Sequence, residues 1–180
     1  LLSTYQIHSA TRDSGVLENE EVLNRMAELK EERKIFMGIS TSGHDQVDII
    51  KKALDIEIQG VRIFDTFQVT YNMLDQGLME VADELKKRKK RIVIKEALAN
   101  GRVFPNDNYP NYTKLYNCLN RLAGKYKVGV DAIALRFCID TVQPFRVLSG
   151  AGNKNHIIDN LKALTIKLEE EELLELQTFK

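Results

Sequence analysis

The sequence is short of cysteine, of net charge and of long apolar runs. Two cysteines, Cys118 and Cys138, are too few for a disulfide scaffold, and both lie in helical apolar patterns, so we expect buried thiols in a reducing compartment. The 26 basic side chains balance the 26 acidic ones, so no net field attracts nucleic acid or an acidic membrane. No apolar run approaches the roughly 20 residues that a membrane-spanning helix needs. We therefore expect neither a nucleic-acid partner nor a membrane partner.

The amino terminus has no signal-peptide layout, so we expect a cytoplasmic protein, or an organellar one if a transit segment was removed. The 180 residues, 43% of them hydrophobic, suit one globular core, and we expect a single domain over residues 1–180. The densest basic stretch, residues 86–91, closes a predicted helix, where cations complement the negative end of the helix dipole. We interpret it as a solvated helix end, with an anion or partner site as the alternative.

Four short apolar runs end at polar residues at nearly regular intervals. They end at His8, Ser40, Gln68 and Lys95, so the intervals are 32, 28 and 27 residues. A strand, a turn, a helix and a return turn together occupy roughly 30 residues. Repeated units of this kind build a parallel sheet covered by helices, and chemistry gathers at the carboxyl ends of its strands. The spacing therefore predicts an α/β fold with these four residues at the functional edge.

Hydrophobic periodicity predicts five strands and seven helices, with a long irregular segment at residues 100–112. A closed (β/α)₈ barrel needs eight strands. We therefore expect an incomplete (β/α)₈ TIM barrel of about five βα units, with about three units missing from the amino end. The predicted strands are at residues 4–7, 35–39, 92–94 and 146–148, with one more contained in residues 61–69. The predicted helices are at residues 18–33, 47–54, 114–126, 131–141, 157–164 and 169–179, with one more that begins near residue 77 and is closed by the basic stretch at 86–91.

Two residues at predicted strand ends could take part in catalysis. His8 could donate a proton or hydrogen bond or bind a metal, although a structural histidine is the alternative. We expect no metal site, because His44 and His156 lie on other loops without ligand spacing. Lys95 could form a Schiff base, as in a lyase, or pair with a neighbouring carboxylate, and we favour the pairing.

A glycine-rich turn at residues 149–153 connects the last predicted strand to a helix. Glycines let backbone amides approach an anion, and the amino terminus of a helix adds positive potential. Barrel enzymes often bind phosphate at this place, although any tight turn between a strand and a helix also uses glycine. Both interpretations stay open from the residues alone.

The ordered motifs of the chain resemble those of the aldo-keto reductases. The motifs are YQIHSA at residues 5–10, GIS at 38–40, FDTFQVTYN at 64–72, KEALANG at 95–101, LSGA at 148–151 and NL at 160–161. The resemblance covers nearly the whole chain. It implies that the chain is the carboxyl-terminal portion of a (β/α)₈ barrel. It also implies an oxidoreductase that transfers hydride from NADPH to an aldehyde or ketone carbonyl, giving an alcohol.

The same resemblance implies a role for each site residue. His8 would orient the substrate carbonyl as the catalytic histidine, and Ser40 and Gln68 would hold the nicotinamide carboxamide. Lys95 stands where the family often has a ring-stacking aromatic residue. The remaining cofactor-binding residues would be Lys95, Glu96 and Leu98 along the nicotinamide and pyrophosphate, and Gly150, Ala151, Gly152, Asn153, His156 and Asn160 around the adenosine 2′-phosphate and adenine.

Two departures from the family pattern modify these expectations. Gly150 and Gly152 replace cationic residues, and only Lys154 and His156 supply charge there, so we expect NADP with NAD as a possible cofactor. The family's aspartate, tyrosine acid and lysine belong to strands that precede these residues, so we expect turnover only from the intact protein. A non-catalytic dinucleotide-binding regulatory subunit is the alternative function, and a Schiff-base lyase using Lys95 the third. The oligomeric state is open.

Overall fold

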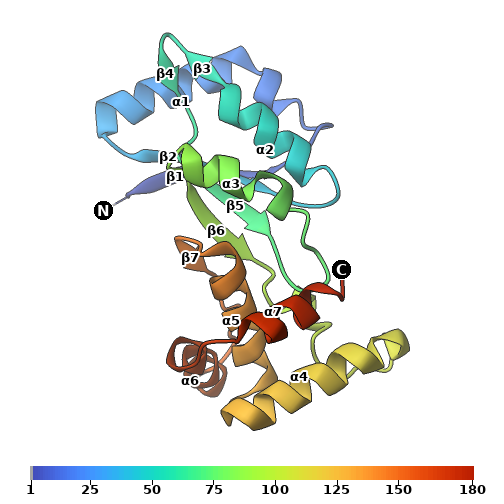
Figure 1. Cartoon of the computed structure of the whole chain (residues 1–180). Coiled ribbons are helices and arrows are strands. Elements are labelled where there is room, and N and C mark those ends of the chain that lie inside the picture. The colour runs from blue at the N-terminus through green and yellow to red at the C-terminus, as the bar shows by residue number, and fades with distance from the viewer. Residues whose placement is uncertain (1) are drawn as a thin grey trace. The chain divides into compact units, whose positions relative to one another are not determined.

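A computed structural model describes residues 2–180 as two compact units (Figure 1). Unit 1 comprises the chain up to Thr70 together with Gly77–Val93, and unit 2 comprises Tyr71–Gln76 and Ile94–Lys180. Strand pairing in the larger sheet follows the order β1-β2-β5-β6-β7, and helices separate these five strands along the chain. The predicted α/β class is therefore confirmed. Within residues 2–180, no helix combines the length and apolarity that crossing a membrane requires.

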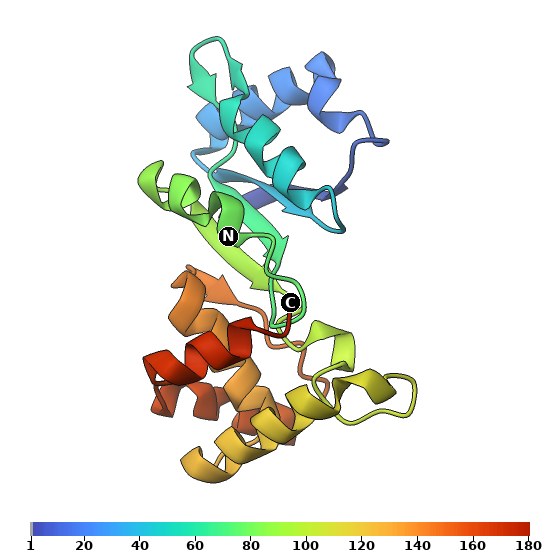
Figure 2. The ribbon, with the colours of Figure 1, turned by 45° about the vertical axis from the view of Figure 1, so that its right-hand side comes forward.

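Unit 1 is built on three parallel strands, with Ile7 opposite Ile39 and Ser40 opposite Gln68. Two helices pack on β2, one of which also contacts β5 (Figures 1 and 2). β2 is almost wholly buried, as expected of a strand inside a parallel sheet. The elements of unit 1 are β1 (Thr4–Ala10), η1 (Val16–Glu18), α1 (Glu20–Arg33), β2 (Phe36–Thr41), α2 (Gln46–Asp55), β3 (Glu57–Ile58), β4 (Val61–Arg62), β5 (Thr66–Thr70) and α3 (Met79–Lys87).

Unit 2 is mainly helical and packs around α5 (Val130–Val142), which contacts α4 (Thr113–Tyr126), α6 (Lys154–Leu161) and α7 (Glu170–Gln177). α5 buries seven side chains, including Phe137 and Cys138, which explains its apolar sequence. Leu148 N donates to Ile94 O at 2.8 Å, beside β6 (Arg91–Lys95) and β7 (Arg146–Val147). Short 3₁₀ helices complete the unit: η2 (Ala99–Gly101), η3 (Pro110–Tyr112) and η4 (Lys162–Thr165).

The strand ends differ in part from the prediction. Lys95 ends β6 as expected. In contrast, β1 runs two residues past His8, β2 runs one residue past Ser40 and β5 runs two residues past Gln68. The strand predicted within residues 61–69 is β5, which begins at Thr66. The start of that range instead forms β4, which pairs antiparallel with β3 and was not predicted. Gln59 and Gly60 both have positive φ, as the tight turn of a two-residue hairpin requires.

The basic stretch at residues 86–91 is less solvated than predicted. Lys90 Nζ donates to Phe64 O at 2.7 Å, and Arg88 Nη1 donates to Leu54 O at 3.1 Å. Burial lowers the pKa of Lys90 from its ordinary value. These two cations therefore secure the chain after α3. The predicted burial of both thiols is confirmed, since Cys118 and Cys138 are free and buried.

Candidate functional site

Unit 1 places three polar side chains, one each from β1, β2 and β5, on the same face of its sheet. Ser40 lies opposite Gln68 in the parallel register and is 1% exposed. Gln6 Nε2 donates to Gln68 Oε1 at 3.0 Å, which turns the Gln68 amide to one orientation. Among the described residues, Gln68 Nε2 donates to no protein group. This face of the sheet therefore has an oriented amide donor, on Gln68, beside the buried hydroxyl of Ser40.

Gly38 lets β1 and β5 lie close to β2 at the level of Gln6, and the hydrogen bond from Gln6 to Gln68 depends on this close approach. It lies opposite Gln6 on one side and Thr66 on the other. A Cβ atom built at Gly38 would lie 2.9 Å from Gln6 Cβ and 3.3 Å from Thr66 O. Any larger side chain would push against Gln6, which holds Gln68. The glycine of the GIS motif thus has a packing role in the site.

His8 lies in β1 next to an irregularity in the strand. The β1–β2 register shifts between Ile7 and Ala10, and Ser9 adopts a φ of 51°. The imidazole is exposed and has no hydrogen-bond partner within residues 2–180. A bulge of this kind commonly re-aims a side chain at the edge of a site. His8 is therefore free to bond to a ligand rather than serving as a structural contact.

Unit 2 holds a compact polar cluster at the end of β6. Lys95 Nζ lies 3.2 Å from Glu96 Oε1, and Asn100 Nδ2 donates to Glu96 Oε2 at 3.2 Å. The buried Asn72 donates through Nδ2 to Glu96 O at 3.0 Å. The predicted pairing of Lys95 with a neighbouring carboxylate is confirmed. An ion-paired ammonium is a poor nucleophile, which weighs against Schiff-base chemistry at this lysine.

The backbone that follows β6 is strained at several positions. Glu96, Ala99 and Asn100 have φ values of 56°, 50° and 53°, and Gly101 has a φ of 88°. Left-handed conformations are uncommon for residues with a Cβ atom, and they concentrate at ligand sites and switch regions. Bonds from Asn72 and Asn100 to Glu96 help to hold this segment in shape.

A cavity of about 500 Å³ lies beside this strained segment. Its volume falls within the roughly 300–1,000 Å³ of typical ligand pockets. The cavity brings together residues from the segment after β6, the turn before α6 and the first turn of α6. Its lining residues are Glu96, Ala97, Leu98, Asn100, Gly101, Phe104, Leu148, Ser149, Gly150 and His156.

Four predicted cofactor residues thus share one cavity, whereas four others lie in the turn or helix next to it. Gly150 has a φ of 65°, as a tight turn requires. Asn153 caps α6 by accepting a hydrogen bond from His156 N at 3.0 Å, so its side chain already has a structural role. Ala151 and Gly152 complete the same turn and do not line the cavity.

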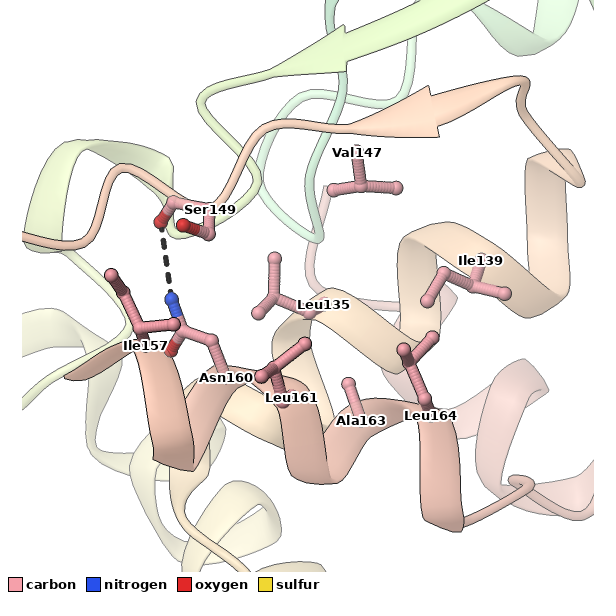
Figure 3. Close-up of a pocket in the computed structure, with 9 residues that line it drawn as sticks. All are labelled: Leu135, Ile139, Val147, Ser149, Ile157, Asn160, Leu161, Ala163 and Leu164. Carbon is pink, nitrogen blue, oxygen red and sulfur yellow. Dashed lines mark hydrogen bonds between the residues drawn. The ribbon is translucent and has the colours of Figure 1, made fainter. Parts of the chain in front are cut away.

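Asn160 lies behind the turn. It is 7% exposed, and its Nδ2 donates to Ser149 O at 3.3 Å (Figure 3). It lines a second, mainly apolar cavity of about 150 Å³ among α5, β7, α6 and η4. Asn160 therefore lies against the turn and lines the smaller cavity but not the larger one, whereas Ser149 lines both.

Several residues of these sites are absent from the sequence-based set of site residues, among them Gln6, Asn72, Asn100, Phe104 and Ser149. Gln6 and Asn72 stand inside the quoted motifs, but their bonds reach Gln68 and Glu96, which are distant in the sequence. Phe104 belongs to the loop at residues 100–112, where length was the only signal. Within residues 2–180, no group of three histidine, cysteine, aspartate or glutamate side chains could hold a metal ion.

Comparison with known proteins matches the model of the aldo/keto reductase family to residues 2–180. No curated protein sequence matches the chain. Among solved structures, the apo form of aldo-keto reductase AKR11C1 from Bacillus halodurans is 24% identical with a TM-score of 0.74, covering 98% of this chain and 61% of that one. Thermostable aldo-keto reductase Tm1743, solved in complex with the inhibitor epalrestat, is 22% identical with a TM-score of 0.72, covering 99% and 60%.

A third similar structure is MGS-M4, an aldo-keto reductase enzyme from a Medee basin deep-sea metagenome library. It is 17% identical with a TM-score of 0.66, covering 99% of this chain and 59% of that one. The chain thus spans about 60% of the length of the solved structures that it matches. The likenesses confirm the predicted fold, an incomplete (β/α)₈ barrel. With the family model matched from residue 2 to residue 180, this chain belongs to the aldo/keto reductase family.

Proposed function

We propose that the protein is an NAD(P)H-dependent oxidoreductase that reduces small aldehydes or ketones to alcohols. Family membership supports the reaction class, and one observation of the site carries the proposal further. Ser40 and Gln68 are direct neighbours on parallel strands, and Gln6 orients the Gln68 amide. A primary carboxamide offers one acceptor and one donor group. An oriented amide donor beside a hydroxyl, which both donates and accepts, matches that group.

The residues present fit a nicotinamide dinucleotide. In unit 1, Ser40 and Gln68 would hold the carboxamide, which sets the ring's orientation. In unit 2, the cavity lined by Leu98, Gly150 and His156 would take part of the nucleotide, and the open backbone at Gly150 lets a ligand approach closely. When bound, the cofactor supplies the hydride, whereas the protein supplies orientation and electrostatics.

His8 would donate a hydrogen bond to the carbonyl oxygen of the substrate. Its imidazole is exposed and free of protein partners in the described part of the chain, so such a bond would not disrupt an existing contact. A donor aimed at an oxygen on which negative charge develops stabilises the transition state more than the ground state. His8→Ala is therefore expected to lower kcat more than it changes the Kd of the cofactor.

NADP is the proposed cofactor, with NAD as the alternative. Lys154 and His156 stand in the first turn of α6 and are exposed, so they could contact a 2′-phosphate. Gly150 and Gly152 offer backbone amides but no side-chain charge. Separate titrations with NADPH and NADH decide between the two cofactors. A Kd for NADPH at least tenfold below that for NADH would support the choice.

The test uses the intact gene product that contains these residues. It is titrated with NADPH, and NADPH consumption is then followed with a panel of small aldehydes and ketones. Ser40→Ala and Gln68→Ala are each expected to raise the Kd of NADPH, by roughly twofold to tenfold for one lost hydrogen bond. Gln177→Ala on α7 is the matched control. Absence of NADPH binding by the intact protein would refute the proposal.

The two alternative functions predict other outcomes in the same assays. NADPH binding without consumption across the whole panel would favour a regulatory dinucleotide-binding subunit. Trapping of a carbonyl compound on Lys95 by borohydride would favour a lyase. The 3.2 Å contact of this lysine with Glu96 predicts that no adduct forms.

A further inference from the structure

The side chain of Gln46 bonds to both backbone groups of Thr70. Gln46 is the first residue of α2, and its Nε2 donates to Thr70 O at 3.1 Å. Thr70 N donates in turn to Gln46 Oε1 at 3.0 Å. The two residues are buried, with exposed fractions of 2% and 4%. A primary amide carries both an acceptor oxygen and a donor NH₂ group, so one side chain satisfies the N–H and the C=O of one residue. These two hydrogen bonds are the Gln46 clamp.

The Gln46 clamp acts where β5 extends past its pairing with β2. The β2–β5 register ends with Ser40 opposite Gln68, and β2 ends one residue after Ser40. β5 continues to Thr70, two residues past Gln68. The amide of Gln46 therefore bonds to the end of β5 as a neighbouring strand would. Without it, a buried N–H and a buried C=O would lose these partners, which is costly.

The Gln46 clamp and the strand register together enclose the two residues proposed to hold the carboxamide. Residues 40–46 lead from Ser40 through the turn after β2 into α2, and residues 68–70 lead from Gln68 to the end of β5. The register fixes Ser40 and Gln68 opposite each other, and the clamp joins the far ends of these two short segments. A group that recognises a ligand by hydrogen bonds needs support of this kind, because its position must hold within roughly 0.5 Å.

We propose that Gln46 is a positioning residue for the carboxamide of the nicotinamide cofactor and acts through Gln68. The proposal rests on the dinucleotide function above and adds a residue on which the geometry of that site depends. The Gln46 amide is buried and bonded to Thr70, so it supports the strand end and does not touch the cofactor. Loss of the Gln46 clamp should therefore weaken binding of the nicotinamide end and leave the other end of the cofactor unaffected.

The first experiment is a double-mutant cycle in the intact protein. Gln46→Met removes both bonds of the clamp and keeps a side chain of similar length. It is expected to raise the Kd of NADPH by roughly twofold to tenfold, the effect of losing the Gln68 hydrogen bond itself. The Kd of adenosine 2′,5′-bisphosphate, which has no nicotinamide, should stay unchanged. Gln46→Met combined with Gln68→Ala should bind NADPH no more weakly than Gln68→Ala alone, because both changes remove the same contact.

Ile50→Ala is the matched control for a loss of stability. Ile50 is fully buried on the same helix and takes no part in the Gln46 clamp. Its truncation should lower the urea midpoint, since it leaves a cavity, but should leave the Kd of NADPH unchanged in the folded protein. A merely structural role for Gln46 predicts that both variants behave alike in all of these titrations.

The second experiment needs no variant, so it applies even if Gln46→Met does not fold. Coupling between two sites is reciprocal, so a bound nicotinamide should stabilise the Gln46 clamp as much as the clamp stabilises binding. Saturation of the wild-type protein with NADPH should slow hydrogen exchange of the Thr70 amide by roughly the same twofold to tenfold. Saturation with adenosine 2′,5′-bisphosphate should leave this exchange rate unchanged.

Three results would overturn the proposal. The first is a wild-type Kd for NADPH in Gln46→Met, and the second is a double variant in which the two increases in Kd multiply. The third is a Thr70 exchange rate that does not respond to NADPH. Failure of the proposed function has a different signature, since the wild-type protein would then bind no NADPH at all.

Discussion

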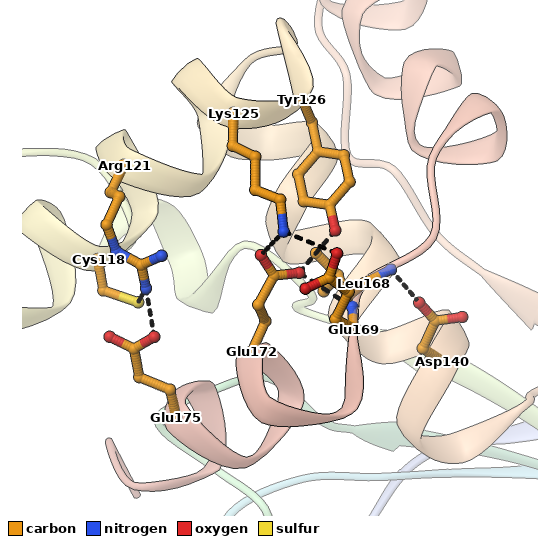
Figure 4. A network of polar contacts seen from close by, with 9 residues as sticks. All are labelled: Cys118, Arg121, Lys125, Tyr126, Asp140, Leu168, Glu169, Glu172 and Glu175. Atoms are coloured by element: carbon orange, nitrogen blue, oxygen red, sulfur yellow. Dashed lines mark hydrogen bonds and ion pairs between the residues drawn. The ribbon is translucent and has the colours of Figure 1, made fainter.

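Glu172 is a buried carboxylate that holds α7 against α4, and its replacement by glutamine has a calculable effect on stability (Figure 4). Its side chain is 7% exposed. It accepts hydrogen bonds from Lys125 Nζ at 2.8 Å, from Tyr126 Oη at 2.6 Å and from Glu169 N at 2.9 Å. The last contact belongs to the capping box that begins α7.

The expected loss follows from these three contacts. A hydrogen bond to a charged group contributes about 1.5–3 kcal/mol, and a glutamine oxygen keeps part of that acceptance without the charge. The Lys125 side chain is 42% exposed, so its ammonium group can bond to water when the carboxylate is removed. This reduces the loss of stability. We therefore expect Glu172→Gln to lower the free energy of unfolding by about 2–3 kcal/mol. Glu171→Gln, an exposed neighbour on α7, should change it by less than about 0.5 kcal/mol.

Urea unfolding followed by circular dichroism measures this difference, and its pH dependence gives a second check. Burial alone raises the pKa of Glu172, but hydrogen bonds from Lys125 and Tyr126 outweigh it, so the pKa lies below the ordinary value of 4.5. A carboxyl whose pKa falls on folding stabilises the protein above the unfolded pKa. This contribution disappears as the pH falls through the lowered pKa of the folded state. The difference in free energy of unfolding between wild type and Glu172→Gln should thus be constant above about pH 5 and shrink below pH 4.5.

Equal urea midpoints at neutral pH, or a difference in free energy of unfolding that is independent of pH, would refute the reasoning.

Two further predictions concern packing and the thiols. Gly38→Ala should lower the free energy of unfolding by about 1–3 kcal/mol, because its Cβ would meet Gln6 at 2.9 Å. Gly124→Ala, within α4 and with nothing near its Cβ, should leave the melting temperature unchanged or raise it, and equal melting of the two variants would contradict this. Burial raises the pKa of Cys118 to about 11 and raises that of Cys138 above its ordinary value. Both thiols therefore stay protonated at pH 8 and should react with a thiol reagent only after unfolding, so rapid labelling of the native protein would disprove their burial.

Local signals in the sequence were enough for most elements. The helix α5 and the strand β6 were predicted correctly from the spacing of their apolar residues. Burial of one or both faces of an element requires apolar residues at a regular spacing, which is visible in the sequence. Lys95 could be placed at a strand end, and its pairing with the adjacent Glu96 involves no long-range contact. That residues 1–180 form a single domain stays a prediction.

Long-range pairing explains the misses. The ends of β1 and β5 depend on which residues pair across the sheet. The shift in the β1–β2 register between Ile7 and Ala10 does not alter the spacing of apolar residues, so the sequence pattern does not show it. The β3–β4 hairpin was missed because Gln59 joins Gly60 in the left-handed region, which is rare for a residue with a Cβ atom. In both cases the outcome reflects contacts or strain that a local pattern does not record.

The sequence by itself determined the fold class, the family motifs and the polar residues near strand ends, because these depend on residues close together in the chain. Only the tertiary structure decided that Gln6 orients Gln68, that Asn72 holds the backbone at Glu96 and that Phe104 lines a cavity with His156. Those contacts join residues separated by 24 to 62 positions. Their formation follows from strand register and backbone strain, which arise when distant segments pack together.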